Sequence, residues 1–297
     1  MLLLTAYMDE TGHSEDKKLH FAGMAGFVAP FKRWECFALQ WQKILDDAGL
    51  KEPFHMKEFA QFRGQFEIEW NGPENKQKRE EFFGKLIATI QETKATPIGA
   101  IVSVEAFRSL TLCQQSAFKD PYYIGFQLCT RGAALEAEGY SPPEKVAMVY
   151  SYNEEFGTTM PNEEVRIDQA GRAEQLWYAI KKHTHFGRWM GSYASSSPRE
   201  IVQLQAADVL AYELFKEFEN RIIRPDDKMR YGLQKILEMV DNPLPKIRLF
   251  DRKELLRQVK EGQFQCQVGT EEIDKTQMIS AMESMERSLR ERVKKTK

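Results

Sequence analysis

The chain opens with a short apolar run that ends in two carboxylates. Residues 2–8 are apolar except for one threonine, and Asp9 and Glu10 follow directly. A run of this length suits a buried β-strand that ends in a turn. Burying a carboxylate costs on the order of several kcal/mol unless it is paired, hydrogen-bonded or bound to a metal. The run therefore predicts a core sheet, and it indicates a specific role for the acid at the end of its first strand.

A second acid lies in a late helix that is otherwise largely apolar. At about 100° per residue, Asp208 falls near the centre of a stripe that also holds Ile201, Leu204, Tyr212 and Phe215. One interpretation is structural, with Asp208 capping a loop or pairing with an arginine in the core. The other is that Asp9 and Asp208 share a cation, since oxygen-rich carboxylate sites favour Mg²⁺ or Mn²⁺.

Residues 54–59 form the third candidate. His55 and Glu58 are three positions apart, so one helical turn brings them to the same side. A histidine between apolar neighbours is also often a packed residue, and the pattern leaves both interpretations open.

Strand and helix patterns alternate through most of the chain. After the first strand we expect strands at 19–28, 98–104 and 146–152, and helices near 30–49, 79–93, 120–138, 162–183 and 199–219. This order is typical of an α/β domain with a mixed sheet flanked by helices, here residues 1–225. Residues 226–297 are predicted to be a helical C-terminal extension, which offers a surface for a protein partner or for self-association.

Charge and hydropathy narrow the class of protein. The 42 basic and 44 acidic residues nearly cancel, so global charge makes no case for nucleic acid, although a metal-dependent nuclease needs only an acidic centre with a locally basic rim. No apolar run approaches the roughly 18 residues of a membrane helix, and the N-terminal leucines lack the basic flank of a signal peptide. We therefore expect a cytoplasmic protein with no membrane partner. The four cysteines lack CxxC spacing, which indicates neither a zinc site nor a disulfide framework.

Three short motifs follow one another in a recognisable order. They are Tyr-Met-Asp-Glu-Thr-Gly at residues 7–12, Phe-His at residues 54–55 and Leu-Gln-Ala-Ala-Asp at residues 204–208. In this order they resemble the family catalogued as domain of unknown function 3800, and the likeness covers roughly residues 4–219. The resemblance implies a ribonuclease H-like fold, a metal-dependent nuclease activity and a bacterial or mobile-element origin.

The resemblance also implies a site in which acids on the first strand, near a later strand and on the last core helix hold two metals. Asp9 matches the first acid and Asp208 the last. The middle acid is where this chain departs, because it has Ser151 where the family often places Asp or Glu. Three alternatives remain open: Glu154 reaches back to the site, Glu58 supplies the missing oxygen, or the metal site is impaired.

The sequence thus predicts a metal-dependent phosphodiester hydrolase that uses Mg²⁺ or Mn²⁺ on nucleic acid or nucleotides. Two kinds of candidate residue follow: catalytic Asp9, Glu10, His55, Glu58 and Asp208, and metal-binding Asp9, Glu154 and Asp208. His55 would carry a proton or contact phosphate. The alternative is a catalytically impaired nucleic-acid- or protein-binding module of the same fold, and a hydrolase of small phosphate esters is a third reading.

Overall fold

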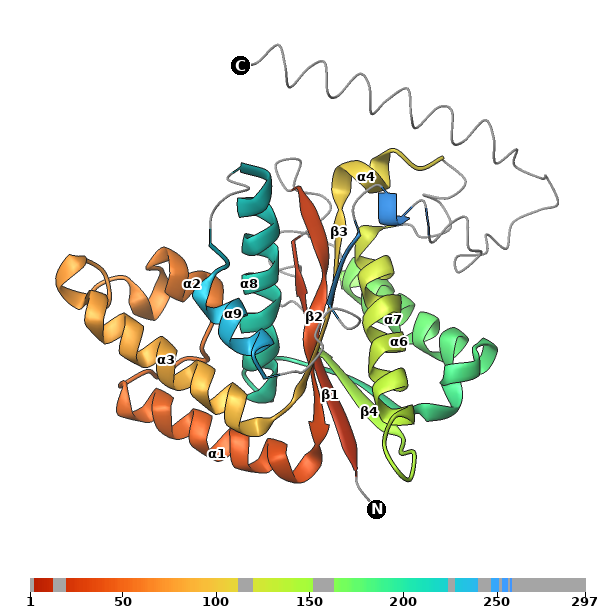
Figure 1. Cartoon of the computed structure of the whole chain (residues 1–297), viewed down its shortest axis with the longest axis horizontal. Helices are drawn as coiled ribbons and strands as arrows, with labels where there is room; N and C mark the ends of the chain where they lie inside the picture. Colours follow the sequence, from red (N-terminus) through yellow and green to blue (C-terminus); the bar gives the residue numbers. More distant parts are fainter. Residues whose placement is uncertain are drawn as a thin grey trace, which may run out of the picture.

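The computed structural model describes residues 3–12, 20–111, 120–151, 163–223, 228–239, 247–250, 253–255 and 257. Within these ranges, one mixed six-stranded sheet has the strand order β5-β4-β1-β2-β3-β6 (Figure 1). The strands are β1 (Leu4–Thr11), β2 (Phe21–Pro30), β3 (Thr96–Ser103), β4 (Val146–Ser151), β5 (Met190–Ser196) and β6 (Ile247–Phe250).

β1 lies in the interior of the sheet, which explains its almost wholly apolar sequence. It pairs antiparallel with β2 and parallel with β4, and β4 pairs parallel with β5. On the other side, β3 pairs antiparallel with β2 and parallel with β6. Since β1, β4 and β5 run in the same direction, their carboxyl ends meet at one end of the sheet. Ligands of α/β proteins commonly bind at such ends.

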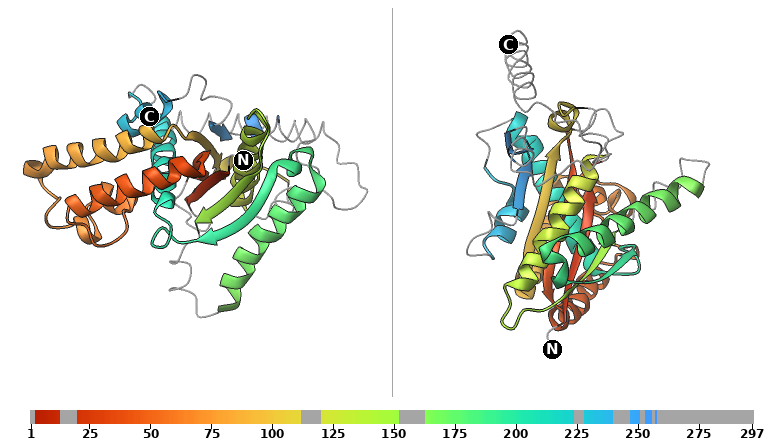
Figure 2. Two further views of the ribbon diagram at one scale, coloured as in Figure 1. Left: turned by 90° about the horizontal axis from the view of Figure 1, so that it is seen from below. Right: turned by 90° about the vertical axis from the view of Figure 1, so that its right-hand side faces the viewer.

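Helices cover both faces of the sheet (Figures 1 and 2). The helices are α1 (Phe31–Asp47), α2 (Met56–Gln61), α3 (Lys76–Thr93), α4 (Val104–Arg108), α6 (Pro121–Glu138), α7 (Glu163–His183), α8 (Gln203–Ile223) and α9 (Tyr231–Leu237), with 3₁₀ turns η1 (Gly64–Phe66), η2 (Pro73–Asn75) and η4 (His185–Trp189). On one face α8 packs directly against β1 and β2, and α1, α2 and α9 contact α8. On the other face α6 packs against β2 and β3 and contacts α7. The expected mixed sheet flanked by helices is confirmed.

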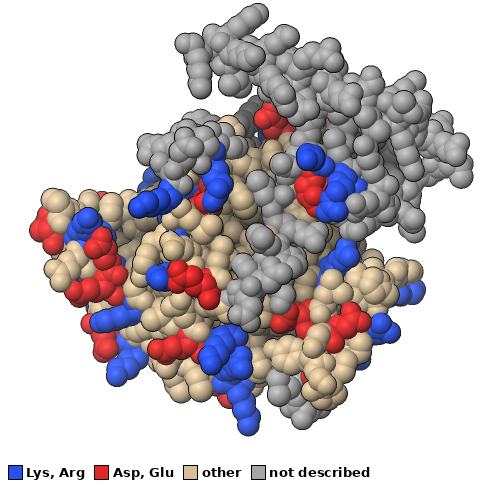
Figure 3. Space-filling view, viewed as in Figure 1, with Lys and Arg blue, Asp and Glu red and all other residues tan. Residues whose placement is uncertain are grey.

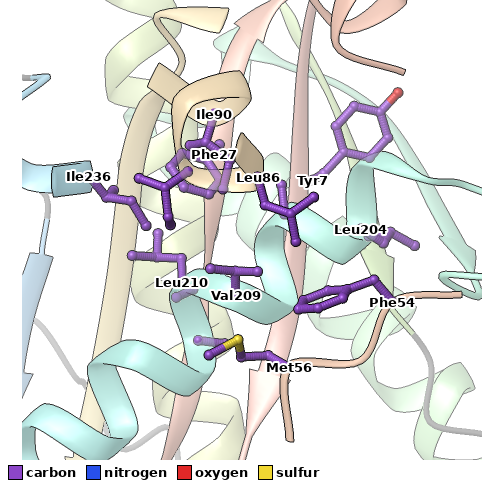
Figure 4. Close-up of a cluster of buried hydrophobic side chains, with 14 of the residues drawn as sticks. Tyr7, Phe27, Phe54, Met56, Leu86, Ile90, Leu204, Val209, Leu210 and Ile236 are labelled. Atoms are coloured by element: carbon purple, nitrogen blue, oxygen red, sulfur yellow. The ribbon is translucent and has the colours of Figure 1, made fainter. Parts of the chain in front are cut away.

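Each face of the sheet has its own apolar core, and the alternation of side chains along β1 divides them. Tyr7 points into the core beneath α8, whereas Ala6 and Met8 point into the core beneath α6. The core beneath α8 is rich in aromatic rings from α1, α2 and α3 and their connections. Figure 4 shows Phe54 in this core beside Val209 of α8. The segment that precedes α2 is therefore anchored to α8 by packing.

Part of the expected C-terminal extension belongs to the central fold. α9 packs against α3 and α8, and β6 adds a strand beside β3. Phe250 of β6 is fully buried. These contacts show that α9 and β6, both within the predicted helical extension, pack against the central fold, and that β6 is a strand and not a helix. A four-residue strand is too short for hydrophobic periodicity to reveal.

The C-terminal residues 258–297 lie outside the described ranges, and with them the surface expected to serve a partner or self-association. None of the described helices combines the length and the apolar composition needed to cross a membrane.

Candidate active site

Asp9 lies near the carboxyl end of β1, on the face of the sheet that α8 covers. The residue is 8% exposed. The parallel register of β1 and β4 sets Met8 beside Tyr150, so Ser151 follows next to Asp9. The Ser151 hydroxyl donates a hydrogen bond to the Asp9 carboxylate, and the N–H of Glu10 donates to Asp9 Oδ1 at 3.0 Å. The first expected site residue is thus held at the end of two neighbouring parallel strands.

α8 brings Asp208 into electrostatic contact with Asp9. The helix packs along β1, and Asp208 is only 9% exposed. Burial, then the charge of Asp208, then the charge of Glu10 raise the pKa of the Asp9 carboxyl well above its ordinary value. The two hydrogen bonds that Asp9 accepts act in the opposite direction, because they favour the ionised form. The two acids selected from the sequence therefore share one environment.

Asp208 also caps α2. Its Oδ2 accepts the N–H of Met56, the first residue of that helix, at 2.7 Å. An acid at a helix N-terminus satisfies a backbone donor and complements the helix dipole. The structural interpretation of Asp208 as a cap is therefore correct in part. The other structural role considered for Asp208, pairing with an arginine, is not seen, because no arginine within the described ranges forms an ion pair with Asp208.

Gln205 holds the same segment one helical turn earlier. Its Oε1 accepts the N–H of Phe54 at 3.1 Å and the indole N–H of Trp41 at 2.8 Å. Its Nε2 donates to the carbonyl of Pro198 at 3.0 Å. Gln205 is 3% exposed, so these bonds satisfy a buried amide. Gln205 is not among the residues predicted from the sequence, although its place in the Leu-Gln-Ala-Ala-Asp motif was a signal that could have identified it.

His55 sits between the two anchored residues, with extended backbone angles of φ −123° and ψ 116°. Its Nδ1 lies 3.5 Å from Asp208 Oδ2, which is within ion-pair range but longer than an ordinary hydrogen bond. The imidazole side chain is 51% exposed. His55 is therefore not a packed core residue, and it combines access to solvent with an acid beside it.

Glu58 lies in the first turn of α2, close enough for its charge to act on Asp208. Burial raises the pKa of Asp208, the neighbouring His55 and the Met56 N–H lower it, and the charge of Glu58 raises it. The Glu58 carboxylate also packs over Gly64, where a side-chain Cβ would lie 2.9 Å from Oε2. Gly64 has a φ of +57°, so glycine suits this turn in both conformation and space. Glu58 thus adds negative charge to the site.

Ser151 occupies the position at which the resemblance implies a third acid. Ser151 stands beside Asp9, where an acid from β4 would complete the set that the resemblance implies. The Ser151 hydroxyl hydrogen-bonds to the Asp9 carboxylate and lowers the pKa of that acid. Glu154 lies outside the described residues.

Glu10 falls on the opposite face of the sheet. Side chains alternate along β1, so Glu10 follows Ala6 and Met8 toward the core beneath α6. Its charge contributes to the raised pKa of Tyr122, which belongs to that side. Glu10 therefore acts on Asp9 through its charge and its backbone N–H, from the far side of the strand.

One further polar pair lies near the site and was not expected from the sequence. Ser196 at the end of β5 is level with Ser151 in the parallel register of β4 and β5. Its hydroxyl donates to Glu200 Oε2 at 2.8 Å. The carboxyl ends of three parallel strands thus carry polar residues, Asp9, Ser151 and Ser196, in one row. Only the strand register reveals this row, since the three residues are far apart in the sequence.

The donor set for a metal is small within the described ranges. These ranges contain no group of three or more histidine, cysteine, aspartate or glutamate side chains arranged to hold an ion. Asp9 and Asp208 are nevertheless hard oxygen donors, and Asp208 Oδ1 accepts no hydrogen bond from a described residue. Mg²⁺ is often bound through one or two carboxylates, with water and substrate phosphate completing its octahedron. The two acids therefore fit such an ion in chemistry.

Surface charge is mixed around the fold. On the face shown in Figure 3, acidic and basic side chains are interspersed over the described elements. This pattern agrees with the formal net charge of −2 and gives no extended basic field on the described part of that face.

No protein-family model matches the chain, and no curated protein sequence matches it. The likeness to the domain of unknown function 3800 family therefore rests on the three motifs alone.

Proposed function

We propose that this chain is a metal-dependent phosphodiester hydrolase, with Mg²⁺ or Mn²⁺ held by Asp9 and Asp208 and with nucleic acid or a nucleotide as substrate. The observation that carries the proposal is the pair itself. Asp9 and Asp208 are residues no more than 9% exposed that share one environment, and no described lysine or arginine forms an ion pair with either. A divalent cation would supply the missing neutralisation.

A ribonuclease H-like arrangement and membership in the domain of unknown function 3800 family are part of this proposal. In support, the acid of the first strand and the acid of the last core helix meet at the carboxyl end of β1. The other two motifs are also joined, because Gln205 and Asp208 hydrogen-bond to the residues on either side of His55. The contacts among the three motifs that carry the resemblance support the proposal of one shared site.

The roles of the side chains follow from their surroundings. A bound metal ion would supply activation of water and stabilisation of the leaving oxygen. Asp9 and Asp208 would hold it, while Asp208 Oδ2 also accepts the Met56 N–H. His55 is exposed beside this pair and transfers a proton to or from the reacting oxygens. Glu58 adds negative charge that favours cation binding.

The proposal is tested by hydrolysis of bis(p-nitrophenyl) phosphate and of labelled single- and double-stranded oligonucleotides, with Mn²⁺, with Mg²⁺ and with chelator. We expect activity only with metal. Asp9→Asn and Asp208→Asn should each lower it at least about 100-fold, the upper range for residues that merely support a metal ligand. Glu80→Gln, which removes an acid from the exposed side of α3, is the matched control and should leave activity unchanged. Metal-independent activity in both aspartate variants would reject the proposal.

The second candidate is a binding module of the same fold without catalysis. It is favoured by Ser151, which stands where the resemblance implies an acid. In that case the wild-type protein binds oligonucleotides or a protein and hydrolyses none of the substrates above. The substitution Ser151→Asp separates the two candidates further, because it restores a carboxylate beside Asp9 and should increase Mn²⁺ affinity only where a metal site exists.

A further inference from the structure

We propose that Gln205 is a positioning residue for His55, and this inference rests on the proposed function. The relevant feature is the extended segment Phe54–Met56. In extended backbone, the N–H groups of residues two apart point the same way. Both of these N–H groups point toward α8, where Gln205 Oε1 accepts the first and Asp208 Oδ2 accepts the second. His55 is the residue between them, and its direction is set by the two bonds.

The spacing on α8 matches the spacing on the segment. Gln205 and Asp208 are three residues apart, so they lie on one side of the helix about one turn apart. Phe54 is fully buried and Met56 nearly so, which fixes the two ends of the segment in the core beneath α8. The central imidazole is left half exposed, with Nδ1 directed to Asp208 Oδ2 at 3.5 Å. The same arrangement therefore orients the histidine and the acid together.

Gln205 is itself held from two further directions. Trp41 of α1 donates to the same Oε1, and the carbonyl of Pro198 before α8 accepts from Nε2. Each of these bonds restricts the amide, so the acceptor presented to Phe54 has one orientation. A side chain of equal length without polar atoms would keep the packing and lose the restraint. Gln205 is 3% exposed and reaches His55 through the segment that carries it.

The test compares Gln205→Met with Gln203→Met. Gln203 lies on the same helix and makes one 3.4 Å contact with the carbonyl of Trp34, so it is the matched control. With bis(p-nitrophenyl) phosphate and Mn²⁺, Gln205→Met should lower kcat about 10- to 100-fold with little change in KM, and Gln203→Met should change neither. In a His55→Gln background the Gln205→Met effect should vanish, because the residue it positions is gone. Additive effects of the two substitutions would overturn the proposal.

A second readout keeps the inference separate from the proposed activity. The imidazole resonances of His55 should shift and broaden in both Gln205→Met and Asp208→Asn, and stay unchanged in Gln203→Met. If wild type hydrolyses no phosphodiester, the proposed function fails while this readout still decides the positioning. Unchanged His55 resonances in a folded Gln205→Met protein, judged by its circular dichroism and melting curve, would overturn it.

Discussion

Asp208 and Glu213 lie in the same helix and are both almost fully buried, yet they are neutralised in different ways. Glu213 is held by both sides of the Arg230 guanidinium, from Nε to Oε2 at 3.1 Å and from Nη2 to Oε1 at 2.6 Å. One turn later, Glu217 accepts the backbone N–H of Arg230 at 3.0 Å and the Nε of Arg221 at 2.7 Å. Asp208 has a backbone N–H and an exposed histidine instead.

The difference separates an acid that is paired within the fold from an acid that, in the proposed function, binds a cation. A bidentate guanidinium–carboxylate pair neutralises a buried carboxylate. Here it also fixes Arg230, the residue that precedes α9. Burial leaves the pKa of Asp208 raised, even though His55 and the Met56 N–H oppose the shift. Perturbed acids of this kind concentrate at functional sites. The carboxyl-terminal half of α8 thus carries acids that are paired with arginine, and its amino-terminal half carries the acid of the candidate site.

The largest effect should come from breaking the structural pair. Arg230→Met leaves Glu213 buried without its cation, and such a loss costs about 3–5 kcal/mol of unfolding free energy. Urea unfolding at neutral pH measures it. The Mn²⁺-induced rise in melting temperature should persist in the variant, because the proposed metal site lies in the other half of the helix. If Arg230→Met were as stable as wild type, the distinction between the two halves would be lost.

The next effect separates the two functions of Asp208. Asp208→Ala removes the acceptor of the Met56 N–H and should lower the unfolding free energy by about 1–3 kcal/mol. Asp208→Asn keeps an oxygen for that bond and removes the charge, so the metal-free protein should be at least as stable as wild type. Both variants should lose the Mn²⁺ shift. A large loss of stability in Asp208→Asn would identify the charge itself as structural.

A smaller effect depends on pH. The folded-state pKa of Asp9 is raised, so its contribution to stability is fully present below the ordinary pKa of about 3.9 and is lost as pH rises through the raised value. Without metal, Asp9→Asn should therefore match wild type at low pH and become progressively more stable than wild type toward pH 8. Melting temperatures of both proteins across this range, with chelator present, measure the difference. A constant difference at every pH would contradict the raised pKa.

The smallest effect concerns Ser151. Ser151→Ala removes one hydrogen bond to the Asp9 carboxylate and should cost roughly 0.5–1.5 kcal/mol at neutral pH. Because this bond favours the ionised acid, the loss should shrink as Asp9 becomes protonated at lower pH. Chemical unfolding at two pH values checks both statements, and Ser195→Ala on β5 provides a serine control in the same sheet. If the loss of unfolding free energy were the same at both pH values, Ser151 would act through packing alone.

The acids of the site could be predicted from the sequence because each interrupts an apolar pattern. Asp9 follows a core strand and Asp208 lies within a core helix, and local periodicity detects both. The contacts of Ser151 and Gln205 could not be predicted in this way. Ser151 meets Asp9 through the register of parallel strands, which depends on the whole fold.

Two errors in the fold have similar causes. The strand β6 was missed because four residues give no measurable period, and its partner β3 is distant in sequence. Glu10 was predicted to be catalytic together with Asp9, because the two acids are adjacent in the sequence. Side chains alternate along β1, so Glu10 points to the face of the sheet opposite Asp9. In both cases, the position of a residue within the assembled sheet decided the outcome.

The hydrogen bonds that anchor His55 also fix when the site can form. They join Phe54 to Gln205 across 151 residues and Met56 to Asp208 across 152. At a synthesis rate of roughly 5–20 residues per second, about 8–30 s separate the two ends of each bond on the ribosome. Until α8 emerges, Asp9 has no partner acid and His55 has no fixed direction. For a nuclease of the kind proposed, this delay would keep the nascent chain inert toward the RNA from which it is being made.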